Sequence, residues 1–391
     1  MTTAPLWPTR YGQLAPRAGL AWRLGNTSVL RAGWGIFYDL GFSAATDPIN
    51  GFPYNRWQFN AGDTAAPTTP VLASSTFAAD LRLPYAQEWN VTFERAVTPT
   101  DVVALSYVGS AGRHLLRRES AMDAVNGLAM GSTATSHGAS HFHALELEYR
   151  RRLSRGLEGV ANYTWSHAID NGSWDSAVAL DGPGYSAAND RGASAFDVRH
   201  NVSAALSYES RGVTGNAFWR GLSSDWNLEG TVRARSGFPV DVLSVENLLG
   251  FGFDDYPRPD LVPGEPLWMA ASSVPGGRRL NPAAFAVVTG RQGTLGRDAI
   301  AGFGMFQADL ALRRRFALGE SASLELGLSA LNAFNHPNPA DPVSHLNTPL
   351  FGQAGSMLNL MLGSGSPRGG LTPAFQTGAA RSLELNLKLR F

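Results

Sequence analysis

The last eleven residues of the chain alternate strictly between polar and apolar side chains. Residues 381–391 read RSLELNLKLRF. The apolar positions are Leu383, Leu385, Leu387, Leu389 and Phe391. Successive side chains of a strand point to opposite faces of its sheet, whereas an apolar helix face recurs every three to four residues. The segment therefore predicts a β-strand with one apolar and one polar face.

The same alternation recurs upstream and predicts an all-β chain. Together with the last segment, eleven strands are predicted, at 16–24, 27–38, 84–97, 100–113, 141–153, 157–166, 195–209, 225–237, 305–316, 321–334 and 381–391. Most are about ten residues or longer, which is the length that a tilted strand needs to cross a bilayer. We expect them to form one wholly antiparallel meander.

The predicted connections alternate between short and long. Short or medium turns are expected at 25–26, 98–100, 154–156, 210–224 and 318–319, and long loops at 39–83, 114–140, 170–194, 238–302 and 335–379. Transmembrane barrels of the bacterial outer membrane have short periplasmic turns and long extracellular loops. A soluble sandwich or propeller has no reason to sort its loops in this way. The pattern predicts a transmembrane β-barrel whose C-terminus is periplasmic.

The composition fits a surface that faces lipid. Only 16% of the residues are charged, against about a quarter in soluble proteins. No run of 18 apolar residues occurs, which excludes a transmembrane helix by sequence. The 32 basic and 32 acidic residues balance, so there is no electrostatic case for nucleic acid. The chain has no Cys, which excludes disulfides, thiolate metal sites and cysteine nucleophiles.

An odd strand count predicts an incomplete barrel. Single-chain bacterial barrels have an even number of strands, and an open sheet edge in lipid is very costly. We expect residues 1–391 to be the C-terminal half of a barrel of roughly 22 strands, with no ladder joining 16–24 to 381–391. The N-terminal sequence MTTAPLWPTRYGQLAPR also lacks the pattern of a signal peptide.

Several segments resemble one receptor family in order, from about residue 14 to the end. They include LAPRAGLAWRL, VLRAGWGIFYD, LPYAQEWNVTFERAV, VVALSYVGSAGRHL, FHALELEYRRRLSRGLEGVANYTWSHAIDN, NDRGASAFDVRHNVSAALSYE, WNLEGTVRARSGFPVDV, RPDLVPG, LNPAAFAV, GTLGRDAIAGFGMFQADLALRRRF, LGLSALNAFNHPN and FGQ before the terminal LELNLKLRF. The chain resembles the barrel of Oar-like TonB-dependent receptors, which carry a carboxypeptidase-regulatory-like N-terminal domain.

The resemblance implies energised uptake of an unidentified ligand at the outer membrane. Members of the family have a signal peptide, a regulatory-like domain, a TonB box and a plug before the barrel, and we expect residues 1–391 to contain none of these parts. The implied partners are the inner-membrane TonB system, outer-membrane lipid and an extracellular ligand. A surface-binding or adhesive barrel without transport, and a fragment with no function of its own, are the alternatives. No catalytic motif such as GxSxG, HExxH or a P-loop occurs, so the chain is predicted not to be an enzyme, which is the last of the classes weighed.

Two sets of residues are predicted to act at the membrane. Leu385, Leu387, Leu389 and Phe391 resemble the terminal signal recognised by the barrel-assembly machinery; the alternative is an ordinary last strand. Interfacial aromatics, whose rings sit at headgroup level, are predicted at Trp22, Trp34, Trp89, Trp165 and Trp226, with Tyr107 and Tyr208. The alternative for these rings is packing in a soluble core.

Two further groups are weighed as metal ligands. His141 and His143 share one strand face, but without a third ligand they are expected to be polar rim residues. Acidic and amide side chains crowd two loops, at Asp170, Asn171, Asp175, Asp181, Asn189, Asp190, Asp254 and Asp255. Such oxygens suit Ca²⁺, but the EF-hand spacing is absent, so solvated turns are expected. No cofactor is predicted.

Overall fold

The structure is a computed structural model of the 391-residue chain. It describes residues 11–39, 56–59, 71–123, 129–173, 178–181, 190–211, 216–244, 246–247, 254–255, 257–289, 291–319, 322–358, 378 and 380–391. All statements about structure concern these residues.

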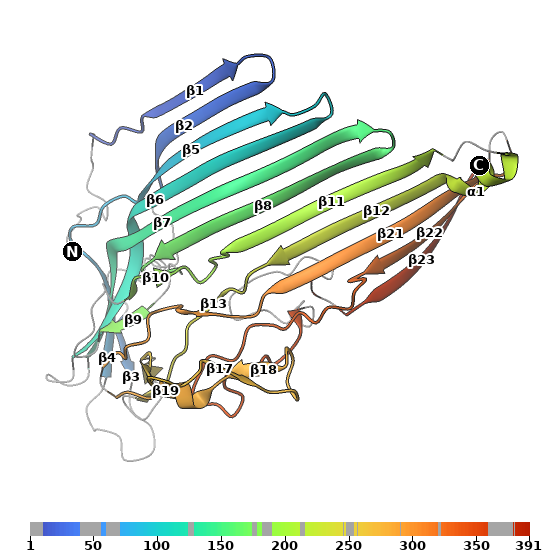
Figure 1. The fold of residues 1–391 in the computed structure, drawn as a ribbon. Coiled ribbons are helices and arrows are strands. Elements are labelled where there is room, and N and C mark those ends of the chain that lie inside the picture. The colour runs from blue at the N-terminus through green and yellow to red at the C-terminus, as the bar shows by residue number, and fades with distance from the viewer. Residues whose placement is uncertain are drawn as a thin grey trace.

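One large meander sheet dominates the fold (Figure 1). Its path runs β1-β2-β5-β6-β7-β8-β11-β12-β21-β22-β23, and each neighbouring pair is antiparallel. The strands are β1 (Arg17–Leu24), β2 (Ser28–Tyr38), β5 (Tyr85–Ala96), β6 (Asp101–Asp123), β7 (Ala129–Ser154), β8 (Leu157–Asp170), β11 (His200–Arg211), β12 (Ser224–Arg235), β21 (Met305–Ala317), β22 (Ser323–Leu331) and β23 (Ser382–Arg390). The prediction of eleven strands in an antiparallel meander is confirmed.

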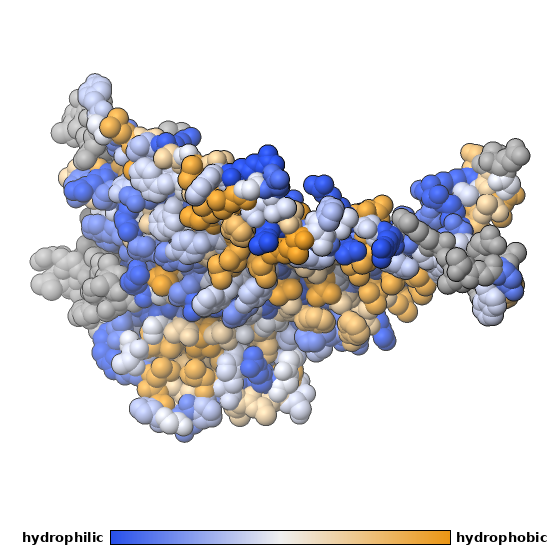
Figure 2. Space-filling model, turned by 45° about the horizontal axis from the view of Figure 1, so that its top comes forward, coloured by the Kyte–Doolittle hydropathy of each residue, from blue (hydrophilic) through white to orange (hydrophobic). Residues whose placement is uncertain are grey.

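Strand register places most large apolar side chains on one face. A single row of partners crosses five strands and reads Tyr208, Leu228, Leu312, Leu328 and Leu385. All five side chains are exposed. A monomeric soluble protein rarely exposes so continuous an apolar surface. In Figure 2, hydrophobic residues gather over the middle of the strands, between more hydrophilic ends. This outer face is built to contact lipid, and the opposite, inner face is polar.

The hairpin of β6 and β7 extends far beyond the length needed to cross a membrane. The two strands have 23 and 26 residues, so the prediction of a long loop at 114–140 is wrong. Register shifts fall between Gly112 and Leu115 and between Leu115 and Arg117, where His114 has a φ of 56°. These irregularities break the alternation, which is why the sequence pattern stops at residue 113 although the strand continues.

Short strands pair with this extension in parallel. β4 (Val71–Phe77) pairs with residues 129–134 of β7, and β9 (Val178–Asp181) pairs with residues 118–121 of β6. β3 (Arg56–Phe59) pairs with β4, and β10 (Gly192–Ala193) with β8. The prediction that all pairing is antiparallel is therefore wrong outside the main path. The parallel strands come from the connections between strands, where no alternation was visible.

The long connection between β12 and β21 folds into a small unit of its own. With residues 338–358 it makes what we call the loop module, which lies below the sheet at the long-loop end in Figure 1. Its elements are β13 (Pro239–Val240), β14 (Glu246–Asn247), β15 (Asp254–Asp255), β16 (Asp260–Leu261), β17 (Trp268–Ala270), β18 (Arg278–Leu280), the 3-10 helix Pro282–Ala284, β19 (Phe285–Ala286) and β20 (Ile300–Ala301). Its buried core comprises Val240, Val242, Leu280, Ala284, Phe285, Leu295, Ile300 and Phe351.

The opposite ends of the strands carry short turns. Gly25 and Gly156 have positive φ values of 73° and 84° in two of these turns, a conformation that glycine adopts without steric cost. The turn between β11 and β12 is longer and contains the helix α1 (Ala217–Ser223). Within the described residues, no helix is long and apolar enough to span a membrane.

The sheet is open. β1 and β23 each pair on one side only, and no ladder joins them in the described residues, as predicted. Because they are the first and eleventh strands of an antiparallel path, both run in the same direction, from the long-loop end to the short-turn end. This shared direction limits how the sheet could close.

The two faces of β22 should respond oppositely to one added charge. Leu328→Arg puts a cation on the outer face and should destabilise the membrane-inserted fold by about 2–4 kcal/mol. Ser329→Arg puts it on the inner face beside Glu384 and should cost little, because the charge remains among polar groups. Urea titration of the membrane-inserted protein measures the free energy of unfolding of both variants. The folded fraction is followed by the change in gel migration that heating causes. Equal losses for the two variants would contradict the assignment of the faces.

Candidate functional site

The inner face forms a polar wall that runs the width of the sheet. Its charged residues include Arg31, Glu94, Glu146, Glu148, Arg150, Glu229, Arg233, Arg235, Arg313, Arg315, Glu325, Glu384, Lys388 and Arg390. Along each strand these residues alternate with the residues of the outer face. The polar face predicted from the sequence is confirmed in this register.

On one side of the wall, Glu94 of β5 bridges two arginines. Its Oε2 lies 3.4 Å from Nη1 of Arg31 on β2 and 3.5 Å from Nη2 of Arg150 on β7. The second contact crosses over β6, where the inner-face residues Val102 and Ala104 are small enough to let the long side chains meet. Small residues on one strand thus allow ion pairs between its two neighbours.

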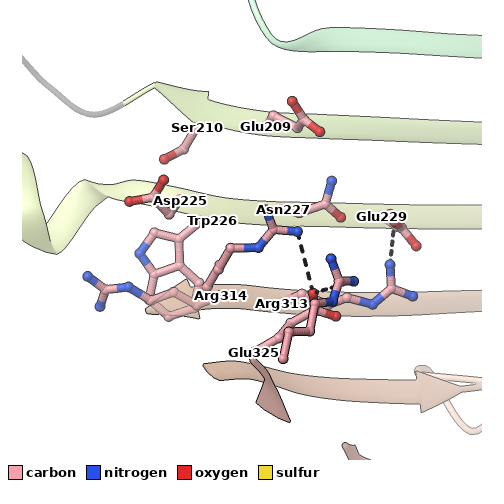
Figure 3. A pocket seen from close by; sticks show the side chains of 11 residues that line it. Glu209, Ser210, Asp225, Trp226, Asn227, Glu229, Arg313, Arg314 and Glu325 are labelled. Carbon is pink, nitrogen blue, oxygen red and sulfur yellow. Dashed lines mark hydrogen bonds and ion pairs between the residues drawn. The ribbon is translucent and has the colours of Figure 1, made fainter. Parts of the chain in front are cut away.

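A groove of about 410 Å³ lies at the short-turn end of β11, β12 and β21–β23, where polar side chains of the inner face meet Trp226 and Arg314, whose register places them on the outer face (Figure 3). Glu325 lies 3.8 Å from Arg315 and 3.5 Å from Arg390, and Glu229 pairs with Arg313. These side chains are substantially exposed, so each pair contributes little to stability. Because positive and negative groups alternate, the groove suits water or a mixed polar surface better than a ligand of one charge.

At the long-loop end, a buried set of ion pairs fastens the loop module to the sheet. We call it the arginine clamp: Arg117, Arg258 and Arg297 with Asp170, Asp190 and Asp298. Arg117 belongs to β6 and Asp170 ends β8, whereas Arg258, Arg297 and Asp298 belong to the loop module. The three arginine side chains are only 3%, 7% and 10% exposed.

Each carboxylate of the clamp has a defined arginine partner. Asp190 accepts from Arg117 and, at 3.2 Å, from Nη1 of Arg258. Arg297 bonds Asp170, donates to Asp298 at 3.2 Å, and donates from Nε to the carbonyl oxygen of Asp190 at 2.6 Å. Arg117 also lies 3.7 Å from Glu119, so the three arginines face four carboxylates and each cation has an anionic partner. Removing one partner would leave a buried charge uncompensated.

The pKa values of two carboxyl groups in the loop module are shifted in opposite directions. Burial raises the pKa of Asp241, whose Oδ1 accepts a bond of 3.3 Å from the backbone N–H of Asp298. Asp260 lies on the exposed side of the loop module, where hydrogen bonds from Arg291 and Thr294 lower its pKa to about 2. Asp260 is therefore an anion at neutral pH, and its paired form is lost only as the pH falls from about 4 to about 2.

The groups weighed as metal ligands do not form a metal site in the described part of the chain. No set of three or more His, Asp or Glu side chains there could hold an ion. The imidazole Nδ1 of His143 instead lies 2.8 Å from the hydroxyl of Tyr107 on the outer face. Asp170 and Asp190 are buried among arginines, so the prediction of solvated turns is wrong for these two.

The remaining members of the acidic groups are only partly visible. Asn171 accepts a hydrogen bond of 2.8 Å from the backbone N–H of Ala139. Asp175 and Asn189 lie outside the described residues, as do the side chains of Asp181, Asp254 and Asp255.

The predicted interfacial aromatics all lie on the outer face, in register with its leucines. Trp22, Trp34 and Trp165 are exposed, and Trp89 and Trp226 are half-buried. The Trp89 ring crosses Gly109, where a Cβ atom would collide with it, and lies 5.9 Å from the ring of His143. Glycine at this position leaves the space that the indole occupies.

These aromatics lie near both ends of the strands. Trp165 pairs in register with His200 near the long-loop end, and Tyr208 and Trp226 lie near the short-turn end. His200 and Tyr208 are eight residues apart on β11, which is about 27 Å along a strand and about 20 Å of depth at the usual tilt. This is close to the height of the apolar band of a barrel, so interfacial roles remain the prediction for these residues.

The terminal residues form an exposed strand edge. Leu385, Leu387 and Leu389 point to the outer face of β23, and Phe391 follows the strand and is 96% exposed. Their placement fits the predicted assembly signal, and their recognition by the assembly machinery stays a prediction.

The arginine clamp was not predicted from the sequence. Its three arginines lie at positions 117, 258 and 297, far apart in the chain and in segments of no regular period. Only folding of the loop module onto β6 and β8 brings them together, so no local pattern could have indicated them.

The open meander, the lipid-type outer face and the polar wall define an outer-membrane β-barrel domain. A family model described as "Outer membrane beta barrel domain" matches residues 2–360. The chain belongs to this family and to the cell outer membrane. No curated protein matches the sequence.

Solved structures to which the chain is similar include transporters and receptors. The outer membrane transporter YddB from Escherichia coli is 11% identical with a TM-score of 0.48, and the match covers 94% of this chain and 39% of that one. The FrpB iron transporter from Neisseria meningitidis is 13% identical with a TM-score of 0.43, and the match covers 97% of this chain and 39% of that one. A mutant of the ferric enterobactin receptor PfeA from Pseudomonas aeruginosa is 12% identical with a TM-score of 0.44, and the match covers 88% of this chain and 37% of that one. The chain thus spans well under half the length of these proteins.

Breaking the arginine clamp should release the loop module. Arg297→Ala leaves Asp170 and Asp298 buried without this cation, a loss of about 3–5 kcal/mol locally. Amide exchange in the loop module, for example at Leu243 and Gly302, should then become about 100-fold faster or more. The control is Arg291→Ala, which removes an exposed arginine from the same module. Unchanged exchange in the first variant would show that the clamp does not fasten the module.

Proposed function

We propose that the chain is the C-terminal part of the barrel of an Oar-like TonB-dependent receptor, which takes up an unidentified ligand by energised transport. The observation that carries the proposal is the pair of open edges, β1 and β23. In lipid, unpaired backbone N–H and C=O groups are too costly to persist. Further strands must therefore cover both edges in the working molecule.

The direction of the edge strands restricts those further strands. Direct pairing of β1 with β23 would be parallel, because both run toward the short-turn end. The barrels of this kind are antiparallel, so closure needs an odd number of additional strands. Eleven more would give 22, the number typical of plugged outer-membrane transporters. This count agrees with the resemblance of the sequence to TonB-dependent receptors.

The two faces and the loop module supply the parts that a receptor needs. In the proposal, the polar wall faces a plug or water, because its charges alternate in sign and stay hydrated. The loop module is rigid, since it has its own core and is fastened by the arginine clamp, and it would help to capture the ligand. The TonB system would act through the plug, and no catalytic role is assigned to this chain.

A rigid loop module also fits the second candidate, a surface-binding or adhesive barrel without transport. Its exposed apolar side chains include Leu261, Leu267, Met269 and Val287. A fragment with no function of its own is the third candidate. Transport and adhesion differ in their dependence on energy, which makes them separable by experiment.

The terminal residue should matter for assembly of the proposed receptor. Deleting Phe391 should lower the amount of protein in the outer membrane several-fold, because the assembly machinery is expected to recognise the aromatic end of β23. Blots of isolated outer membranes measure the effect. The comparison is Asp260→Asn, a change in the exposed loop module. Equal membrane levels for both variants would remove the assembly-signal hypothesis.

Uptake should depend on the proton-motive force. Cells with the complete receptor and cells in which its gene is deleted are grown in the same medium, and untargeted mass spectrometry follows the loss of medium compounds. The receptor should deplete at least one compound that the deletion strain leaves, and a protonophore should abolish that depletion. Because every compound of the medium is followed, the ligand need not be chosen in advance.

The adhesin predicts a different outcome of the same experiment. Both strains would then deplete the same compounds, while only the receptor-bearing cells would attach to a surface, with or without the protonophore. That result would replace the transport proposal.

A further inference from the structure

A cation stands on the outer face of the sheet, where apolar residues are otherwise the rule. Arg314 lies on β21 between the outer-face residues Leu312 and Phe316, and its register partner is Trp226 near the start of β12. A cation on the lipid face costs about 2–4 kcal/mol at the midplane and about 0–1 near an interface. The position of Arg314, beside the short turns, is at an interface.

The guanidinium of Arg314 lies against two aromatic rings. Its Cζ is 4.9 Å from the ring centroid of Trp226 and 4.7 Å from that of Phe316. Figure 3 labels Arg314 beside Trp226 at one end of the groove. Cation–π contacts of this kind hold the group in place without neutralising it.

No carboxylate of the described residues lies within ion-pair distance of Arg314, whereas Arg313 and Arg315 on the inner face pair with Glu229 and Glu325. Its Nε is buried and has no hydrogen-bond partner there. Its Nη2 donates to the carbonyl oxygen of Gly221, a neutral group. The positive charge is therefore oriented by the protein but not balanced by it.

The bond to Gly221 also holds the helix α1 beside the outer face. α1 carries Phe218 and Trp219, which are 69% and 55% exposed and pack edge to face with centroids 5.3 Å apart. Other short turns described here, such as 97–100, carry no such pair of rings. Exposed Phe and Trp next to Arg are typical of the membrane–water interface.

We propose that Arg314, Trp226, Phe316 and α1 form a binding site for an anionic phospholipid of the periplasmic leaflet. The guanidinium binds the headgroup phosphate by charge-assisted hydrogen bonds, and the rings contact the glycerol and upper acyl region. β11, β12 and β21 lie in the middle of the strand order and not at the sheet edges. Strands added at β1 or β23 therefore leave the outer face of these three strands open to lipid. The site does not depend on what the receptor transports.

The first test is lipid retention. Protein extracted from the outer membranes of producing cells is mixed in detergent with phosphatidylglycerol and examined by native mass spectrometry. The wild type should retain the lipid, and Arg314→Gln should weaken retention about tenfold. Arg95→Gln is the matched control, because Arg95 lies on the same face near the same end and no ring is stacked on it in the described residues. Diacylglycerol, which lacks the phosphate, should not be retained.

A second test does not require altering the arginine. The chain has no Cys, so one cysteine can be placed at Phe218 or at Pro99, in the turn between β5 and β6, and labelled with a fluorophore. In vesicles of phosphatidylethanolamine and phosphatidylglycerol with brominated lipid, the label at 218 should be quenched and the label at 99 should not. Heat-modifiable migration confirms folding of each variant.

Three results would overturn the proposal. They are equal lipid retention by the wild type and Arg314→Gln, displacement of the lipid by inorganic phosphate at the same concentration, and equal quenching at positions 218 and 99. The second would assign the site to free phosphate rather than to a lipid.

Discussion

The need to satisfy every backbone hydrogen bond in lipid governs this structure. Water cannot bond an exposed N–H or C=O group inside a bilayer, so the chain crosses only as strands paired on both sides. The long ladders from β2 to β22 meet this requirement, and their register places most large apolar side chains on one face. The edges of β1 and β23, which each pair on one side only in the described residues, are the places where this requirement is not met, and the proposal of further strands rests on them.

Outside the bilayer, apolar side chains are buried in a core, as in soluble proteins. The largest cluster of buried apolar residues in the described chain lies in the loop module and not in the sheet, because the outer face of the sheet is meant to contact lipid. A core this small holds its position with help from the arginine clamp, which joins it to β6 and β8. The module is thus coupled directly to the wall of the barrel.

The arrangement of charged residues differs between the two faces of the sheet and along the length of the strands. The inner face carries interleaved ion pairs, which keep the wall polar without a strong net charge. On the outer face near the short turns, Arg314 stands among aromatic rings without an acidic partner in the described residues. A polar wall suits water or a plug, whereas an oriented and unbalanced cation suits the phosphate of a lipid.

The sequence alone determined the eleven strands of the meander, the apolar face of each strand and most of the division between short turns and long loops, since a period of two is a local property that tertiary contacts leave unchanged. Segments such as 305–316 and 381–391 were predicted to within about two residues of β21 and β23. Tertiary structure decided what depends on contacts between distant segments. The extension of β6 and β7 has an irregular register, the parallel strands β4 and β9 pair outside the meander, and the arginine clamp joins residues 117, 258 and 297. None of these has a signal in neighbouring residues, because each exists only where the folded chain brings separate segments together.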